Sequence, residues 1–190
     1  MACETVIAAG FTRECDNRPA AGATKQYWGN RDDIDAVSYS AGGGAITAIS
    51  LKTGKQIYEV EAVDEGLSIA HEFSRDEFGA AYIHTTRFRL QDNSDTIADQ
   101  KITLKESRIF SIVQTIDEGS DGSAKFKVAG IKNGLKLSVD TLDSAADNGT
   151  NPLEFATLEG EEEACGLNVF WDTDETTTDA AIATLLTPAP

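Results

Sequence analysis

The chain contains two histidines, and their ability to bind a metal ion depends on how their segments pair. His71 and His84 lie in stretches of alternating polarity that are typical of β-strands. If the chain reverses at residues 76–79 so that Arg75 lies opposite Ala80, the two imidazoles face each other across an antiparallel pair. A structural zinc site needs four nitrogen or sulfur ligands. We therefore interpret the histidines as half-buried sheet residues and expect no metal and no cofactor.

Clustered carboxylates are the second group that could do chemistry. The segment Asp117–Ser123 faintly resembles a calcium-binding loop. It lacks an oxygen ligand at its third position, and Val128 stands where a bidentate glutamate belongs. We interpret it as a hairpin loop. The other clusters are interpreted as solvated charge: Asp32, Asp33 and Asp35, and the run from Glu161 to Glu163.

The sequence carries no GxSxG, HExxH or cysteine–histidine signature. Its thirty-two acids leave room for the paired carboxylates of a glycosidase, but no feature favours that chemistry. Cys3, Cys15 and Cys165 form no CxxC pair, which favours a reduced protein made in a cytosol, although a Cys3–Cys15 bridge stays possible. We predict that the protein is not an enzyme.

The N-terminus and the hydropathy pattern bear on localisation. The residues Met1–Glu4 have neither the basic region nor the apolar region of a secretory signal. Apolar runs stay well short of the ~18 residues that a membrane span requires. We expect a protein that is neither exported by such a signal nor integral to a membrane.

Net charge is −16, and its distribution is uneven. Residues 137–190 contain twelve acids and no lysine or arginine, whereas residues 1–136 contribute −4. Binding to nucleic acid by phosphate neutralisation needs clustered basic residues, so we exclude it. An anionic surface could still let nucleic acid pass without sticking. On charge alone, a solvated acidic face that keeps the protein soluble is the simpler interpretation.

The elements that would position these residues are mostly strands, and the longest is a two-stranded ribbon over Leu67–Leu90. In its second half the residues alternate between two faces over thirteen positions, or roughly 43 Å at ~3.3 Å per residue. Usual strands span only ~17–20 Å. A ribbon that outruns its domain usually completes its contacts on a neighbouring subunit. Its apolar positions are therefore candidates for self-assembly: Leu67, Ile69, Phe73, Phe78, Tyr82, Phe88 and Leu90.

The remaining pattern predicts a single domain over residues 1–190, with an N-terminal arm (1–25) and a C-terminal tail (172–190). We expect Ala45–Leu51 to pair with Lys55–Val63, a helix over Thr96–Glu106, and a hairpin of Ile109–Ile116 with Ala124–Gly130. A short terminal helix is expected over Thr177–Leu186. Strands that follow one another directly favour antiparallel pairing. The predicted fold is mainly β, an antiparallel sandwich or half-open barrel with a long hairpin and one flanking helix.

This organisation resembles the tail tube proteins of tailed bacteriophages and contractile injection systems. The likeness is carried by the strand-rich single domain, the ribbon Leu67–Leu90, the helix after it and the hairpin Ile109–Gly130. The segment Asn148–Phe155 (NGTNPLEF) adds to it. The N-terminal pattern of Met1-Ala2-Cys3, Gly10-Phe11 and Cys15 also resembles phage structural proteins.

The resemblance implies a hexameric ring in which each subunit gives strands to a barrel around a channel. Rings would stack into a tube in the virion tail, assembled in the bacterial host cytoplasm, with a sheath or terminator protein as a further partner. DNA would pass down the bore without specific binding. On this hypothesis the channel-lining candidates are Glu59 and Glu61, which alternate with Tyr58, Val60 and Ala62, and Glu72.

Two other functions fit the same pattern. The protein could be another virion component, such as a capsid-decorating or head–tail joining protein. It could also be a carbohydrate-binding or adhesin-like β-sandwich that stacks sugars on Tyr27, Trp28 and Trp171. Such aromatics are more often core or interface residues.

Overall fold

The computed structural model describes residues 22–61, 66–76, 79–90, 94–119, 121–142 and 150–190. Most of the expected N-terminal arm lies outside these residues, but its last three, Ala23 to Lys25, belong to a strand. The described elements are β1 (Ala23–Asn30), η1 (Arg31–Asp33), β2 (Ile34–Tyr39), β3 (Ala45–Leu51), β4 (Tyr58–Val60), β5 (Ser68–Asp76), β6 (Gly79–Leu90), α1 (Asp95–Leu104), β7 (Ile109–Thr115), β8 (Phe126–Ala129), β9 (Lys136–Asp140), β10 (Asn151–Ala156), β11 (Asn168–Phe170) and α2 (Glu175–Leu185).

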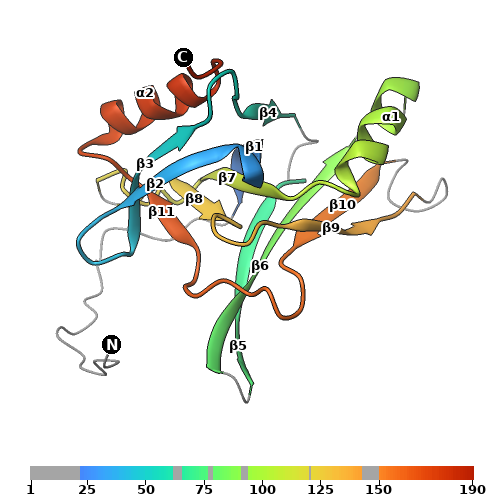
Figure 1. Cartoon of the computed structure of the whole chain (residues 1–190), viewed down its shortest axis with the longest axis horizontal. Coiled ribbons are helices and arrows are strands. Elements are labelled where there is room, and N and C mark those ends of the chain that lie inside the picture. The colour runs from blue at the N-terminus through green and yellow to red at the C-terminus, as the bar shows by residue number, and fades with distance from the viewer. Residues whose placement is uncertain (1–21, 62–65, 77–78, 91–93, 120, 143–149) are drawn as a thin grey trace.

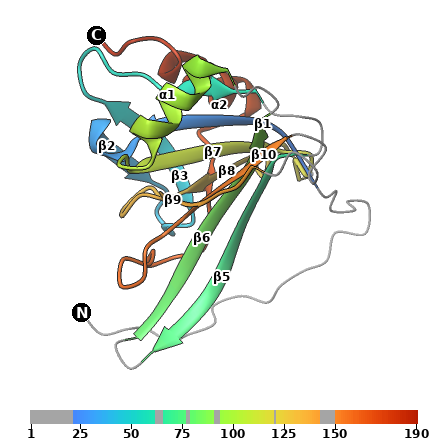
Figure 2. The same ribbon diagram turned by 90° about the vertical axis from the view of Figure 1, so that its right-hand side faces the viewer.

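The strands form two sheets, which Figures 1 and 2 show from two directions. One has the order β2-β3-β11-β8-β7-β1-β4 and the other the order β5-β6-β10-β9. Described neighbours run antiparallel except β11 and β3, which run parallel. The described strands close no barrel. The predicted mainly β class, a sandwich with a long hairpin and a flanking helix, is confirmed.

Several local predictions are confirmed as well. The helix expected over Thr96–Glu106 is α1, and the expected terminal helix is α2. The hairpin expected around Asp117–Ser123 joins β7 to β8. In its loop the Asp121 carboxylate accepts a hydrogen bond from the Ser123 amide at 3.0 Å, which is the chemistry of a turn.

The expected pairing of Ala45–Leu51 with Lys55–Val63 is wrong. β3 pairs with β2 and β11, whereas β4 pairs with β1. The C-terminal segment explains the difference, because it takes the backbone hydrogen bonds of the chain between β3 and β4. The Gly54 amide donates to the Ala189 carbonyl, the Ala189 amide to the Lys55 carbonyl, and the Ile57 amide to the Leu185 carbonyl.

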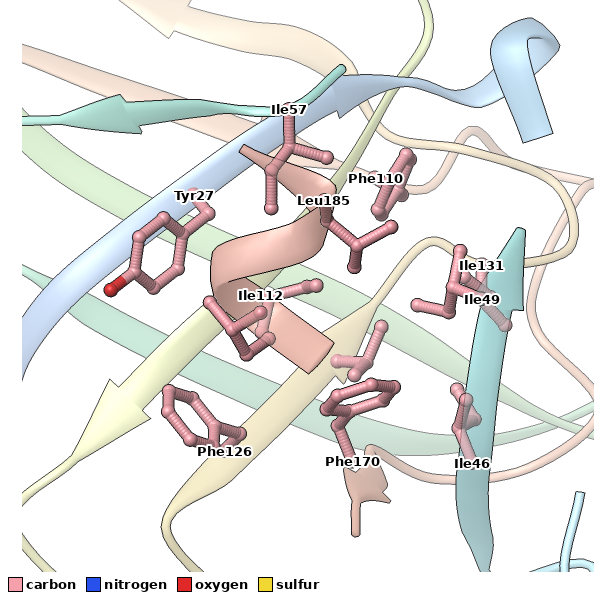
Figure 3. Close-up of a cluster of buried hydrophobic side chains, with 12 residues drawn as sticks. Tyr27, Ile46, Ile49, Ile57, Phe110, Ile112, Phe126, Ile131, Phe170 and Leu185 are labelled. Atoms are coloured by element: carbon pink, nitrogen blue, oxygen red, sulfur yellow. The ribbon is translucent and has the colours of Figure 1, made fainter. Parts of the chain in front are cut away.

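The larger hydrophobic core lies between the seven-stranded sheet and α2 (Figure 3). Asp174 begins α2 by accepting a hydrogen bond from the Thr177 amide at 2.8 Å, an N-cap that satisfies one free helix donor. Ile182 and Leu185, three residues apart, then face the sheet. They pack among strand residues that include Tyr27, Ile112 and Phe170. The C-terminal tail of the prediction is therefore a packed part of the fold.

A second core joins the two sheets at the inner end of the ribbon. Phe88 and Phe155 are buried there, and the ring of Trp28 contacts each of them edge-on at a centroid distance of 4.9 Å. A polar link lies beside them. The Gln26 amide nitrogen donates to Thr86 Oγ1 at 2.7 Å and to Ser111 Oγ at 3.0 Å. The base of β6 is thus fixed to the larger sheet.

Candidate functional site

The ribbon of β5 and β6 extends away from the body in both views of the molecule (Figures 1 and 2). Its register places Arg75 opposite Ala80, so that His71 lies opposite His84 as expected. β6 pairs with β10 only from Thr85 to Leu90, at the inner end. The outer end is therefore a two-stranded element with few contacts to the rest of the described chain.

One loop supports the middle of the ribbon. The backbones of Tyr82 and Glu163 exchange two hydrogen bonds, at 2.8 and 2.9 Å. Glu163 is only 2% exposed, and its Oε1 accepts hydrogen bonds from the amides of Lys132 (3.2 Å) and Asn133 (2.9 Å). The interpretation of residues 161–163 as solvated charge is wrong for Glu163, because these amides give its carboxyl group a buried binding place. Glu161 is paired with the guanidinium of Arg108.

The two histidines help to hold the same loop. His84 is buried, and its Nδ1 accepts a hydrogen bond from the Gly130 amide at 3.3 Å, so Nε2 carries the proton and donates it to the Cys165 carbonyl at 2.9 Å. Burial lowers the pKa of His84 below its usual 6.5. His71 Nδ1 accepts from the Leu167 amide at 3.3 Å. Both rings therefore serve as hydrogen-bonding links between the ribbon and residues 165–167.

The outer edge of β5 is open. The amide and carbonyl of Tyr82 bond to Glu163, so Tyr82 and Phe73 form a non-hydrogen-bonded pair of the antiparallel ribbon. The amide and carbonyl of Phe73 must then point outward, and so must those of Ile69, His71 and Arg75, at alternate positions. None of these groups has a backbone partner among the described residues. Within the described part of the chain, a nine-residue strand thus presents a row of donors and acceptors without backbone partners.

The predicted self-assembly residues divide by their place along the ribbon. Phe88 is fully buried in the second core, and Leu67, Ile69 and Leu90 are half-buried against it. Tyr82 is half-buried further out. Phe73 is 53% exposed, with its ring against Tyr82 at a centroid distance of 5.4 Å. Phe78 lies outside the described residues.

The structure places the predicted channel-lining acids on two different strands. Glu59 lies within β4, at the edge of the larger sheet, and Glu61 directly follows that strand. Glu59 pairs with Lys25 at 3.0 Å. Glu72 lies on β5, exposed, on the ribbon face opposite Phe73. The apolar side expected for the β4 segment is only partly covered, since Tyr58 is 60% exposed and Val60 is half-buried. Ala62 lies outside the described residues.

An open groove lies between β4 and α1, which sequence reasoning missed. It has a volume of about 670 Å³. The apolar part of its lining comes from both sheets and from α1: Trp28, Tyr58, Val60, Phe88, Leu90, Ile97, Leu104 and Leu153. The spacing of Ile97, Lys101 and Leu104 in the expected helix Thr96–Glu106 was the available signal, because it places them on one side of the helix and all three line this groove.

The aromatic residues proposed as sugar platforms occupy different environments. Tyr27 is buried in the larger core, where desolvation raises the pKa of its phenol. Trp28 is held between Phe88 and Phe155, and Trp171 is half-buried beyond β11. A stacking platform needs an exposed ring face, so the positions of Tyr27 and Trp28 do not favour sugar binding.

Comparison with known proteins adds no relative. No protein-family model, no curated protein and no solved structure matches this chain. Neither helix in the described part of the chain is long and apolar enough to cross a bilayer. Function must therefore be inferred from the geometry of this chain.

Proposed function

We propose that the protein is a self-assembling structural subunit of a virus particle, a tail tube protein whose copies form stacked rings around a channel for the genome. The single observation that carries this proposal is the projecting ribbon with its open outer edge. Edge strands of this length are usually covered, twisted away or charged in proteins that stay monomeric. Pairing with an edge of a second copy would satisfy the outward groups of β5.

The charge of the chain supports the same function. A net charge of −16 gives a surface that repels phosphate, so a channel built from these subunits lets DNA slide. Glu72 is the acid best placed to face such a channel, because it is exposed on the projecting ribbon and lies on the face opposite Phe73. Glu59 is less available because it is paired with Lys25.

The experiment compares two variants at one position of the open edge. His71→Pro and His71→Ala both remove the side-chain bond to Leu167, but only proline also removes the outward amide. Both variants should fold, because neither change touches the hydrogen bonds between β5 and β6. Glu72→Pro serves as a control that breaks the ribbon itself, since the amide of Glu72 points toward β6.

Sedimentation velocity measures assembly, and negative-stain images show its form. Wild type and His71→Ala should form rings or tubes. His71→Pro should need roughly a fivefold to tenfold higher concentration, since a lost hydrogen bond costs about 1–1.5 kcal/mol. A wild-type chain that stays monomeric over the whole accessible concentration range would refute the proposal. Images that place the protein on the capsid or at the head–tail junction would assign it to another virion role.

A further inference from the structure

The helix α1 covers the groove incompletely. None of its ten residues is buried, and Ile102 is 61% exposed. Its inward residues Ile97 and Leu104 line the groove together with the indole of Trp28, whose buried Nε1 has no hydrogen-bond partner among the described residues. Isolated helices of ten residues are marginal in water and need tertiary contacts. The groove is therefore an apolar surface with room for a further segment.

The rim of the groove beside β4 is acidic. Glu59 and Glu61 both line it. Glu59 is already paired with Lys25, and the cation on the helix side, Lys101, is paired with Asp140 at 2.7 Å. Glu61 is exposed and has no ion-pair partner among the described residues. A segment that fills this groove would gain from an apolar side chain next to one positive charge.

The outer ribbon presents a face with this chemistry. Phe73 and Arg75 are two residues apart on β5, so they lie on the same face, and Tyr82 and Ala80 of β6 lie opposite them. Phe73 is largely exposed, and Arg75 is exposed with no ion-pair partner in the described chain. Glu72 and Ser74 point to the other face. The Phe73 side of the ribbon is thus apolar and cationic.

We infer that the Phe73–Arg75 face of the ribbon of one copy docks into the α1–β4 groove of a second copy, with Phe73 in the apolar groove and Arg75 beside Glu61. This inference rests on the proposed function, since it assigns a surface to the assembly contact. A molecule cannot fill its own groove this way, because its ribbon points away from α1 in both views (Figures 1 and 2). The contact joins two different surfaces and is heterologous, so it generates a ring or a continuing filament.

The test uses the full-length chain and measures assembly by sedimentation velocity. Phe73→Ser should raise the concentration for half-assembly at least tenfold. Tyr39→Ser is the matched control, because Tyr39 is an aromatic residue of similar exposure, 46%, on the edge strand β2. The control should change that concentration less than threefold. Urea denaturation confirms that each variant folds.

Charge reversal supplies the decisive comparison. Arg75→Glu and Glu61→Arg should each weaken assembly, and the double variant should recover most of the loss, because the ion pair is restored with its charges exchanged. Folding defects cannot produce such mutual rescue. If the wild type assembles but Phe73→Ser assembles equally well, or the double variant shows no rescue, the docking contact is wrong and the proposed function stands. A wild-type monomer would overturn both.

Discussion

Replacing Glu163 by alanine should loosen the loop that supports the ribbon. In the folded protein its Oε1 accepts hydrogen bonds from the amides of Lys132 and Asn133, and its own backbone is paired with Tyr82. Alanine keeps the backbone pair but leaves both amides without an acceptor. Glutamine keeps an oxygen in the same place, so both amides retain their partner.

The expected loss follows from the surroundings of the two amides. An unsatisfied buried donor costs about 1–3 kcal/mol. Lys132 is exposed, so water can replace the acceptor there, whereas Asn133 is partly buried and water replaces it less well. The alanine variant should therefore lose about 2 kcal/mol of unfolding free energy. The glutamine variant should lose less than about 1 kcal/mol.

Urea denaturation followed by circular dichroism measures this difference. With a slope of about 2 kcal/mol per molar urea, Glu163→Ala should shift the midpoint down by roughly 1 M. Glu159→Ala is the control, because this glutamate is exposed in the same loop, and surface changes usually stay within about 0.5 kcal/mol. Equal midpoints for the alanine and glutamine variants at position 163 would show that the hydrogen bonds to this side chain do not support the loop.

Three further predictions concern stability. Folding lowers the pKa of His84, so as pH falls the unfolded chain binds a proton at this residue before the folded chain does. The free energy of unfolding should therefore decrease below pH 6.5. Urea midpoints measured across that range should fall less in His84→Gln than in the wild type. Gly130→Ala should lower the free energy of unfolding by at least about 2 kcal/mol, since φ is 68° and the new Cβ would lie 2.6 Å from the Leu135 side chain. Gly54→Ala is the control, because φ is 76° but the space around it is open, and it should lower that free energy by about 1 kcal/mol in the same assay. Lys125→Met should release two carboxylates of α2 and lower thermal stability by a few degrees.

The ribbon could be predicted because its two strands are adjacent in sequence. Two-residue alternation fixes which side chains share a face, and the polar reversal at residues 76–79 fixes which residues lie opposite each other. The β7–β8 hairpin follows from the same logic. In both cases partners in space are close in sequence, so the pattern and the turn together determine the pairing.

Pairing across long sequence separations could not be predicted. The residues of β4 alternate as a strand should, but nothing in them specifies β1 as the partner. That choice depends on Leu185 and Ala189, which bind the preceding segment more than 120 residues away in sequence. The burial of Glu163 is similar, because the amides that bind its carboxyl group belong to residues 132–133. From sequence alone an acidic run is interpreted as solvent-exposed, because the backbone amides that bind such a carboxylate are identified only in the folded structure.

The exposed apolar residues of the ribbon and the groove raise the question of how assembly would stay selective. The chain exposes Phe73, Tyr58 and Ile102 near the open edge of β5 and the α1–β4 groove. Exposed apolar surface of this kind favours non-specific aggregation. On the self-assembly hypothesis, two features would make association selective. The net charge of −16 would repel copies in most orientations, and Arg75 beside Phe73 would be a local exception to that repulsion. Only an approach that brings this cation to an acidic rim lowers the repulsion while it buries the apolar surface. Assembly of the Arg75→Ala variant should therefore become stronger with added salt, because salt screens the general repulsion between copies. Wild-type assembly should respond less, because salt also weakens the attraction between Arg75 and Glu61, which only the wild type can form.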